Sequence, residues 1–188
     1  MRNALAAVAV GLELDISFDK IKKGLERFEG VFRRFQLKAE TDGVMVIDDY
    51  AHHPTEVQAT LSAARKGWKD RRIVAVFQPH LYSRTRELYE EFGSSFFDAE
   101  VCVITDVYPS REEPIEGVNG KLIADAAREY GHRNVHYVEQ KSELPDRLKE
   151  IVKAGDVIIT MGAGDIYRYG ETFCEMLRDG IENLSNAP

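Results

Sequence analysis

The stretch that decides the fold is Val44-Met45-Val46-Ile47-Asp48-Asp49-Tyr50-Ala51-His52-His53-Pro54-Thr55-Glu56-Val57. Its leading apolar residues are typical of a strand, and the proline is typical of the first residue of a helix. Two acids, a tyrosine and two histidines lie near the junction. Open α/β sheets build ligand sites from this order of elements, because the crevice lies outside the carboxyl ends of the strands and helix N-termini face it.

The residues before this stretch predict a hairpin and two helices. The segments 35–39 and 44–47 are β-rich, and Asp42-Gly43 between them is a strong hairpin signal. Further upstream, we expect a helix over 2–12 and a second one that begins after Ser17 and stops at Gly30. The first helix has no capping residue, so the chain is expected to begin inside an element.

The residues after the stretch alternate between apolar strands and amphipathic helices. We expect strands over 72–77, 101–105, 134–138 and 157–160, helices over 55–66, 84–97 and 122–130, a helix capped by Ser142, a helix capped by Asp165 and a frayed tail over 181–188. This alternation predicts an α/β fold with a Rossmann-like, mostly parallel sheet of about six strands, one of them antiparallel, flanked by helices.

Length and composition are those of an ordinary globular protein. The 188 residues allow one domain, or one domain and an appendage, and no run approaches the length of a membrane span. The formal net charge of −7 argues against a nucleic-acid surface. Cys102 and Cys174 lie in apolar settings, so we expect two buried free thiols, which suits the cytoplasm.

Four polar segments directly follow apolar strands. They are 48–53, 78–84, 106–113 and 162–165. If the strands are parallel, all four lie on one edge of the sheet, which is the expected ligand edge. This convergence is a stronger indication of a site than any single motif.

Several side chains in these segments have both a binding and a structural interpretation. His52 and His80 could each bind an anion such as a phosphate or a carboxylate, or each could have a purely structural role. Arg84 lies near a helix start, where a cation is unfavourable, which hints that it binds a ligand anion. Asp49 could accept ribose hydroxyls, or it could be a helix-capping or turn acid. The adjacent arginines Arg33 and Arg34 could lie in a solvent-exposed junction, or they could form a cationic clamp at an interdomain hinge.

Two glycine-rich segments resemble phosphate-binding motifs and lack their essential parts. The segment 117–122 has no Ser or Thr for Mg²⁺ and no strand leading into it, so we interpret it as a helix start. Gly162-Ala163-Gly164 lacks a third glycine, so we expect a tight turn with close backbone approach. The residues also predict no metal site and no nucleophile–base pair.

Five spaced motifs resemble the ATP-dependent, amino-acid-adding Mur ligases of peptidoglycan synthesis, above all the alanine-adding members. They are Asn-Ala-Leu-Ala-Ala at 3–7, Phe-Glu-Gly-Val-Phe-Arg-Arg-Phe-Gln at 28–36, the acid-rich turn at 48–57, Val-Phe-Gln-Pro-His-Leu-Tyr-Ser-Arg-Thr-Arg at 76–86 and Met-Gly-Ala-Gly-Asp-Ile at 161–166. The murein-peptide ligases share the turn at 48–57, but Arg-Arg-Phe-Gln fits the alanine-adding members better.

The resemblance implies a domain organisation. Residues 1–31 would be the last helices of a central ATPase domain, and residues 32–188 would be the C-terminal Rossmann-like domain of a cytoplasmic ligase. The phosphate loop, the UDP-sugar domain and most contacts to ATP and Mg²⁺ would lie outside this chain, which would be inactive alone. The alternative from another class is a stand-alone, non-catalytic module that binds a nucleotide or an amino acid.

The resemblance also implies roles for single residues. The whole enzyme would join L-alanine to UDP-N-acetylmuramate through an acyl phosphate. Asn3, Arg34 and Asp49 would contact ATP. The alanine and acyl-phosphate end of the site would consist of Tyr50, His52, His80 and Arg84, with Arg84 on the alanine carboxylate. Many relatives have arginine at the position of Leu81. No catalytic residue and no metal ligand is expected within this chain.

Overall fold

The computed structural model describes residues 2–28 and 30–185, which form part of two compact units, residues 1–32 and 33–188. The smaller unit contains the helices α1 (Arg2–Glu13) and α2 (Phe18–Glu26). They approach closely at Gly11, where an added Cβ would lie 2.7 Å from Cδ1 of Ile21. Ile21 is buried, whereas most other large apolar side chains of this unit are exposed.

The second helix starts as predicted but ends early. The carbonyl of Ser17 accepts the amides of Lys20 and Ile21, although its hydroxyl makes no capping bond. The prediction that Gly30 stops this helix is wrong. The helix ends at Glu26, and Gly30, with φ of +100°, lies in the following connection.

The larger unit contains a six-stranded sheet in the order β1-β2-β6-β3-β4-β5. The strands are β1 (Gln36–Thr41), β2 (Val44–Asp49), β3 (Ile73–Phe77), β4 (Val101–Thr105), β5 (Val135–Val138) and β6 (Val157–Met161). Only β1 and β2 pair antiparallel among these strands. At their turn, Asp42 and Gly43 have φ of +51° and +71°, as a two-residue hairpin requires. The predicted fold class is confirmed.

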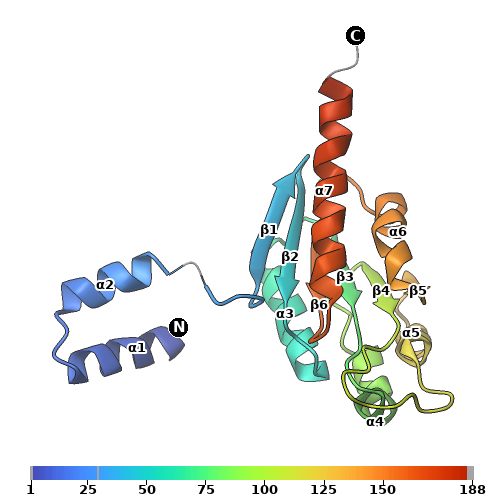
Figure 1. Cartoon of the computed structure of the whole chain (residues 1–188), viewed down its shortest axis with the longest axis horizontal. Coiled ribbons are helices and arrows are strands. Elements are labelled where there is room, and N and C mark those ends of the chain that lie inside the picture. The colour runs from blue at the N-terminus through green and yellow to red at the C-terminus, as the bar shows by residue number, and fades with distance from the viewer. Residues whose placement is uncertain (1, 29, 186–188) are drawn as a thin grey trace. The chain divides into compact units, whose positions relative to one another are not determined.

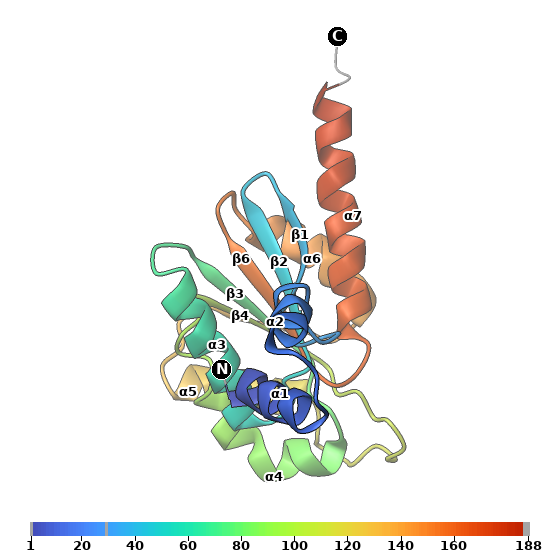
Figure 2. The same cartoon turned by 90° about the vertical axis from the view of Figure 1, so that its left-hand side faces the viewer.

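Helices cover both faces of this sheet (Figure 1). One face packs against α3 (Pro54–Gly67), α4 (Tyr82–Gly93) and α5 (Gly120–Glu129), and the other against α6 (Leu144–Ile151) and α7 (Ile166–Ser185). Strands β3, β4 and β6 are buried throughout, which explains their continuous apolar sequences. Figure 2 shows α7 running beside the β1–β2 hairpin, which it contacts.

Several predicted helix limits need correction. Helix α4 covers 82–93 rather than 84–97, and Phe96 joins the core from the turn that follows. Ser142 does not cap α6. It lies inside a 3-10 turn (Lys141–Glu143), and α6 begins at Leu144 because Pro145 suits the first helical turn. Helix α7 continues to Ser185, so the tail predicted from 181 is wrong up to that residue, and 186–188 lie outside the described residues.

Two further sequence predictions concern the whole chain. Cys102 and Cys174 are buried free thiols, as expected. Across residues 2–28 and 30–185, no helix is long and apolar enough to cross a membrane.

Candidate functional site

The four polar segments after the strands meet at one edge of the sheet, as predicted. The Gly162 amide donates to the Asp49 carbonyl at 3.3 Å, which joins the ends of β2 and β6. The Gln78 amide donates to Met161, and the Gln78 side chain donates to Asp165 at 2.9 Å, which joins β3 to β6. The Leu81 amide donates to the Tyr108 carbonyl, so the segment after β4 joins as well.

The two glycine-rich segments have the structural roles that we predicted. An added Cβ at Gly162, where φ is +148°, would lie 2.7 Å from the Gln78 carbonyl oxygen. At Gly164 it would lie 2.4 Å from Oε1 of Gln78. The other segment is the start of α5, where the Asn119 side chain accepts the Lys121 amide. Gly162 and Gly164 are therefore required by the close approach of Gln78, and the segment 117–122 contains the start of α5.

Asp49 occupies the turn at the end of β2 and is 7% exposed. Its carboxylate accepts the amides of Phe35 and Ala51, each at 2.8 Å. The structural interpretation of Asp49 as a turn acid is therefore correct. Each carboxylate oxygen keeps a second acceptor position.

His52 and His80 lie close together, with ring centroids 6.1 Å apart. Nδ1 of His52 is 2.8 Å from the Tyr50 carbonyl oxygen, and the His80 ring stacks on Tyr108 at 5.8 Å. Nδ1 of His80 is buried without a hydrogen-bond partner among the described residues. Burial lowers the pKa of His80, and the charges of Arg84 and His52 lower it further, so its ring is neutral at pH 7.

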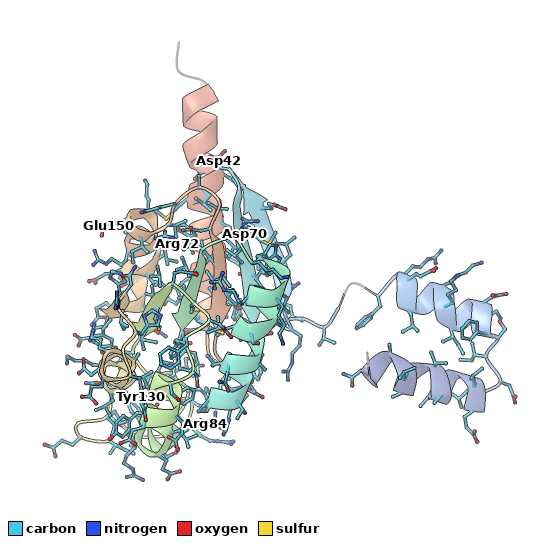
Figure 3. All side chains as sticks on the ribbon, turned by 180° about the vertical axis from the view of Figure 1, so that it is seen from behind. Asp42, Asp70, Arg72, Arg84, Tyr130 and Glu150 are labelled. Carbon is cyan, nitrogen blue, oxygen red and sulfur yellow. The ribbon has the colours of Figure 1, made fainter. Side chains whose placement is uncertain are left out.

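Arg84 lies in the first turn of α4 and reaches the same edge of the sheet. Its Nη1 donates to the His52 carbonyl at 3.4 Å, and Figure 3 shows it at the end of the larger unit opposite to Arg72. Tyr50, with 36% exposure, completes the group through its edge contact with the His52 ring at 5.1 Å. The structure thus brings together the four residues predicted for the substrate end.

Glu112 holds the start of α4, a role that the sequence reasoning missed. The residue before this helix, Leu81, has no capping side chain and has φ of +73°. Instead, the Glu112 carboxylate accepts the Ser83 amide at 2.9 Å and the Ser83 hydroxyl at 2.5 Å. These bonds lower the pKa of Glu112. The sequence signal for this role was the lack of a capping residue before α4, which indicates that a distant side chain supplies the cap.

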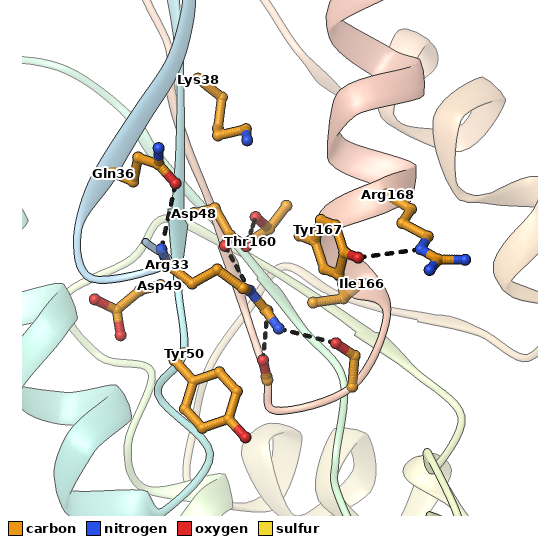
Figure 4. A network of polar contacts seen from close by, with 12 residues as sticks. Arg33, Gln36, Lys38, Asp48, Asp49, Tyr50, Thr160, Ile166, Tyr167 and Arg168 are labelled. Carbon is orange, nitrogen blue, oxygen red and sulfur yellow. Dashed lines mark hydrogen bonds and ion pairs between the residues drawn. The ribbon is translucent and has the colours of Figure 1, made fainter. Parts of the chain in front are cut away.

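The two adjacent arginines have different environments, and Figure 4 shows that of Arg33. Arg33 is 6% exposed, and its guanidinium donates to Asp48 at 2.8 Å and to the carbonyls of Gly162 and Gly164 at 2.6 and 2.9 Å. Burial raises the pKa of Asp48, although the hydrogen bonds from Arg33 and from a threonine oppose the rise. Arg34 is exposed, and its guanidinium lies 5.9 Å from the Tyr50 ring centroid.

Lys141 adds a fifth segment to this edge, which the sequence reasoning also missed. Its Nζ lies 2.8 and 2.9 Å from the two carboxylate oxygens of Asp165, between the end of β5 and the start of α7. Burial alone would raise the pKa of Asp165, but the bonds from Lys141 and Gln78 outweigh it and lower that pKa. The sequence predicts that Asp165 caps the last helix. It directly precedes α7 and its carbonyl accepts the Arg168 amide, while its carboxylate binds Gln78 and Lys141.

Asn3 belongs to the smaller unit. It lines an apolar cavity of about 290 Å³ between α1 and α2, together with Ala4, Ala7, Leu25, Phe28 and Val31. No group of three or more His, Cys, Asp or Glu side chains that would hold a metal occurs among the described residues. In the larger unit, the edge described above carries two exposed or partly exposed arginines, Arg34 and Arg84, and two histidines, His52 and His80.

Comparison with known proteins shows the family of the chain. The sequence model of the family described as "Mur ligase, glutamate ligase domain" matches residues 33–164. The chain belongs to the Mur ligase family. The UDP-N-acetylmuramate–L-alanine ligase of Salinibacter ruber is 58% identical over 179 residues, which cover 95% of this chain and 38% of that protein. The chain thus spans well under half the length of this Mur ligase.

Solved Mur ligase structures share the fold. The UDP-N-acetylmuramate–alanine ligase of Thermotoga maritima has a TM-score of 0.79 at 31% identity, with 95% of this chain and 37% of that chain covered. A murein peptide ligase from Psychrobacter arcticus has a TM-score of 0.66 at 25% identity, with coverage of 93% and 36%. The alanine-adding structure is therefore more similar than this murein peptide ligase in both sequence and fold.

Proposed function

We propose that this chain is the C-terminal part of an ATP-dependent ligase that joins L-alanine to UDP-N-acetylmuramate. The observation that carries the proposal is the cluster of Tyr50, His52, His80 and Arg84 at the carboxyl edge of a Mur ligase sheet. A partly buried arginine beside a neutral imidazole suits a small carboxylate or an acyl phosphate. The similarity to alanine-adding ligases favours L-alanine as the acceptor.

We assign residues 1–31 to the end of the central ATPase domain and residues 32–188 to the C-terminal domain. In this proposal, ATP transfers a phosphoryl group to the muramate carboxylate and leaves as ADP. The alanine amine then attacks the acyl carbon, and inorganic phosphate and a proton leave as the amide forms. Such a reaction needs positioning and charge neutralisation more than a protein nucleophile. The chain alone is then inactive, because the phosphate loop and the Mg²⁺ ligands lie on parts that it does not span.

Three residues would contact ATP from this chain. Asn3 would meet the nucleoside, since its amide borders an apolar cavity of about 290 Å³. Arg34 would meet the phosphates, because its guanidinium is exposed. Asp49 would accept a ribose hydroxyl with the acceptor positions that its two backbone amides leave open. The ligase would act in the cytoplasm, which fits its two buried free thiols.

A chimeric ligase tests this function. In it, this chain replaces the matching segment of the Salinibacter ruber enzyme, and release of ADP is measured with UDP-N-acetylmuramate and L-alanine. We expect turnover by the chimeric ligase and none by the 188-residue chain. Turnover with a murein peptide in place of alanine would favour the recycling ligase instead. No turnover with either acceptor, together with ATP or alanine binding by the chain, would favour a binding module.

Arg84 allows a sharper test of the acceptor end. In the chimeric ligase, we expect Arg84→Ala to raise KM for alanine about tenfold or more and to change KM for ATP little, because a charge-assisted hydrogen bond is lost. Arg86→Ala is the matched control, since Arg86 lies on the same helix and forms an ion pair with the exposed Glu87. Unchanged alanine kinetics in Arg84→Ala would remove Arg84 from the site.

A further inference from the structure

We propose that Arg33 is a positioning residue, which holds both Arg34 and the Gly162–Asp165 turn in place. The inference rests on the proposed function only for what Arg34 does, since the contacts of Arg33 stand by themselves. We call Arg33, Asp48, Thr160, Gly162 and Gly164 the Arg33 cluster.

The guanidinium of Arg33 joins two strand ends that are distant in sequence. Its Nε donates to Asp48 at the end of β2, while Nη1 and Nη2 donate to the carbonyls of Gly164 and Gly162 after β6. The other carboxylate oxygen of Asp48 accepts the Thr160 hydroxyl at 2.8 Å. Since the Arg33 and Asp48 side chains are only 7% and 2% exposed, each needs the other's charge.

Two aromatic rings restrain the same guanidinium. The Tyr50 ring centroid lies 5.2 Å from the Arg33 Cζ, and that of Tyr167, in the first turn of α7, lies 4.7 Å away. Figure 4 shows Tyr50 and Tyr167 beside the guanidinium. Cation–π contacts at these distances favour one orientation of the planar group.

The backbone on both sides of Arg34 depends on this anchor. The Arg33 carbonyl accepts the Tyr50 amide at 2.7 Å, and the Phe35 amide donates to Asp49 at 2.8 Å. Arg33 and Phe35 have φ of +57° and +50°, which are unfavourable for residues with a side chain. Such backbone persists only where surrounding contacts hold it. Loss of the Arg33 guanidinium would therefore release the backbone that presents Arg34.

Lysine cannot replace Arg33 in this role. Three acceptors at different positions are bound by three nitrogens of one planar fork, whereas lysine carries a single nitrogen at the end of a flexible chain. We therefore expect Arg33→Lys to behave like Arg33→Met, although it keeps the charge.

Hydrogen exchange of the 188-residue chain tests the proposal, with Arg72→Met as the control. Arg72 also bonds a carboxylate, that of Asp156, at 2.9 and 2.6 Å and a carbonyl, that of Ile151, at 2.8 Å, but at the opposite end of the sheet from Arg84 (Figure 3). Arg72 thus binds the same types of acceptor as Arg33, a carboxylate and a backbone carbonyl, but at the other end of the sheet.

We expect Arg33→Met and Arg33→Lys to speed exchange of the Phe35, Tyr50 and Gly162 amides about tenfold or more, because local opening becomes easier. The Lys153 and Val157 amides, which bond Asp156 and Arg72, should change little. Arg72→Met should show the reverse pattern. Unchanged exchange at Tyr50 and Gly162, or an equal rise at both ends of the sheet, would overturn the proposal.

A milder variant guards against failure of Arg33→Met to fold. Thr160→Val removes the hydroxyl, which donates to Asp48 at 2.8 Å and to the Ile47 carbonyl at 3.3 Å, and keeps the shape of the side chain. It should speed exchange of the same amides by a smaller factor, and unchanged exchange would count against the cluster.

Kinetics of the chimeric ligase provide the second readout. Arg33→Met should lower kcat/KM for ATP about tenfold or more and change KM for alanine little, because Arg34 is displaced and Arg84 is not. Arg72→Met should leave both constants unchanged. An equal loss for ATP and alanine would overturn the link to Arg34. If the chimeric ligase has no activity at all, the proposed function fails, while the exchange result still decides the role of Arg33.

Discussion

His80 and Arg84 show how single residues set the charge of the sheet edge. The pKa of His80 lies below its usual value because the ring is buried and then because Arg84 is near. A neutral imidazole beside an arginine leaves one fixed positive charge and one polar ring. In the proposed function, this combination would bind an anionic group of the substrate.

The charge of His80 gives a testable pH dependence. We expect its ring protons to titrate, in NMR spectra, with a pKa below the ordinary value of about 6.5. Arg84→Gln should raise this pKa by removing a nearby positive charge, and the control Arg86→Gln should not. Titration of His80 above 6.5 in the unsubstituted chain would contradict the description of the site.

The same shift predicts a sign for stability. Because the folded-state pKa of His80 is lowered, the unfolded chain binds this proton more readily than the folded chain. His80 therefore disfavours the folded state as pH falls from about 6.5 through the folded-state pKa. Relative to the parent chain, His80→Gln should lose less stability between pH 7 and pH 5, as measured by urea unfolding.

At the scale of elements, α4 receives its N-terminal cap from a distant loop. Glu112 accepts both the amide and the hydroxyl of Ser83, where a carboxylate is also favoured by the helix dipole. It thereby fixes the turn that carries Arg84. The lowered pKa of Glu112 means that this contribution is present above its unfolded-state pKa and is lost as pH falls.

Replacement of Glu112 should loosen α4 at its first turn. Glu112→Ala should lower Tm at pH 7 and speed exchange of the Ser83 amide, and the difference in Tm from the parent should shrink toward pH 3. The neighbouring exposed Glu113 provides the control variant, Glu113→Ala. Equal Tm values for the two variants would show that the contact between Glu112 and Ser83 does not stabilise α4.

The start of α5 provides a test of close packing. An added Cβ at Gly120 would lie 2.0 Å from the Thr105 carbonyl oxygen, so Gly120→Ala should destabilise the chain by about 1–3 kcal/mol or more. Gly67, in α3, has no neighbour within 4 Å of that position, so Gly67→Ala should stabilise it by up to about 1 kcal/mol. Urea unfolding measures both, and effects of the same sign would contradict the packing described.

At the scale of the whole larger unit, two apolar cores lie on opposite faces of one sheet. Leu61 of α3 belongs to one core and Leu148 of α6 to the other, and both are fully buried. Leu61→Ala and Leu148→Ala should each cost about 2–5 kcal/mol of unfolding free energy.

The double variant tests whether the two cores unfold together. Since the sheet separates these side chains, the two costs should add within about 0.5 kcal/mol in one cooperative transition. A denaturation curve with two steps, or a double variant no less stable than one of the single variants, would show that the faces unfold separately.

The sequence by itself determined the class of fold and the edge of the sheet at which the polar segments meet. Alternating periodicities predicted the strands and helices, and Asp42-Gly43 predicted the hairpin, because these signals are local. Parallel strands then required that Asp48–His53, Gln78–Arg84, Asp106–Glu113 and Gly162–Asp165 meet at one edge. The helix ends were predicted less accurately, as at Ser142, because a few backbone hydrogen bonds decide where a helix begins and sequence patterns do not specify them.

Only the tertiary structure decided which charged residues are buried and what they hold. Strand order places β6 between β2 and β3, so Arg33 meets carbonyls 129 and 131 positions later in the chain, whereas Arg34 remains exposed. Glu112 caps the first turn of α4 through Ser83, which lies 29 positions earlier in the chain. Lys141, which follows β5, forms an ion pair with Asp165, which follows β6. Such partners depend on which strands are neighbours and on which side chains lose water, and neither is contained in a local pattern of residues.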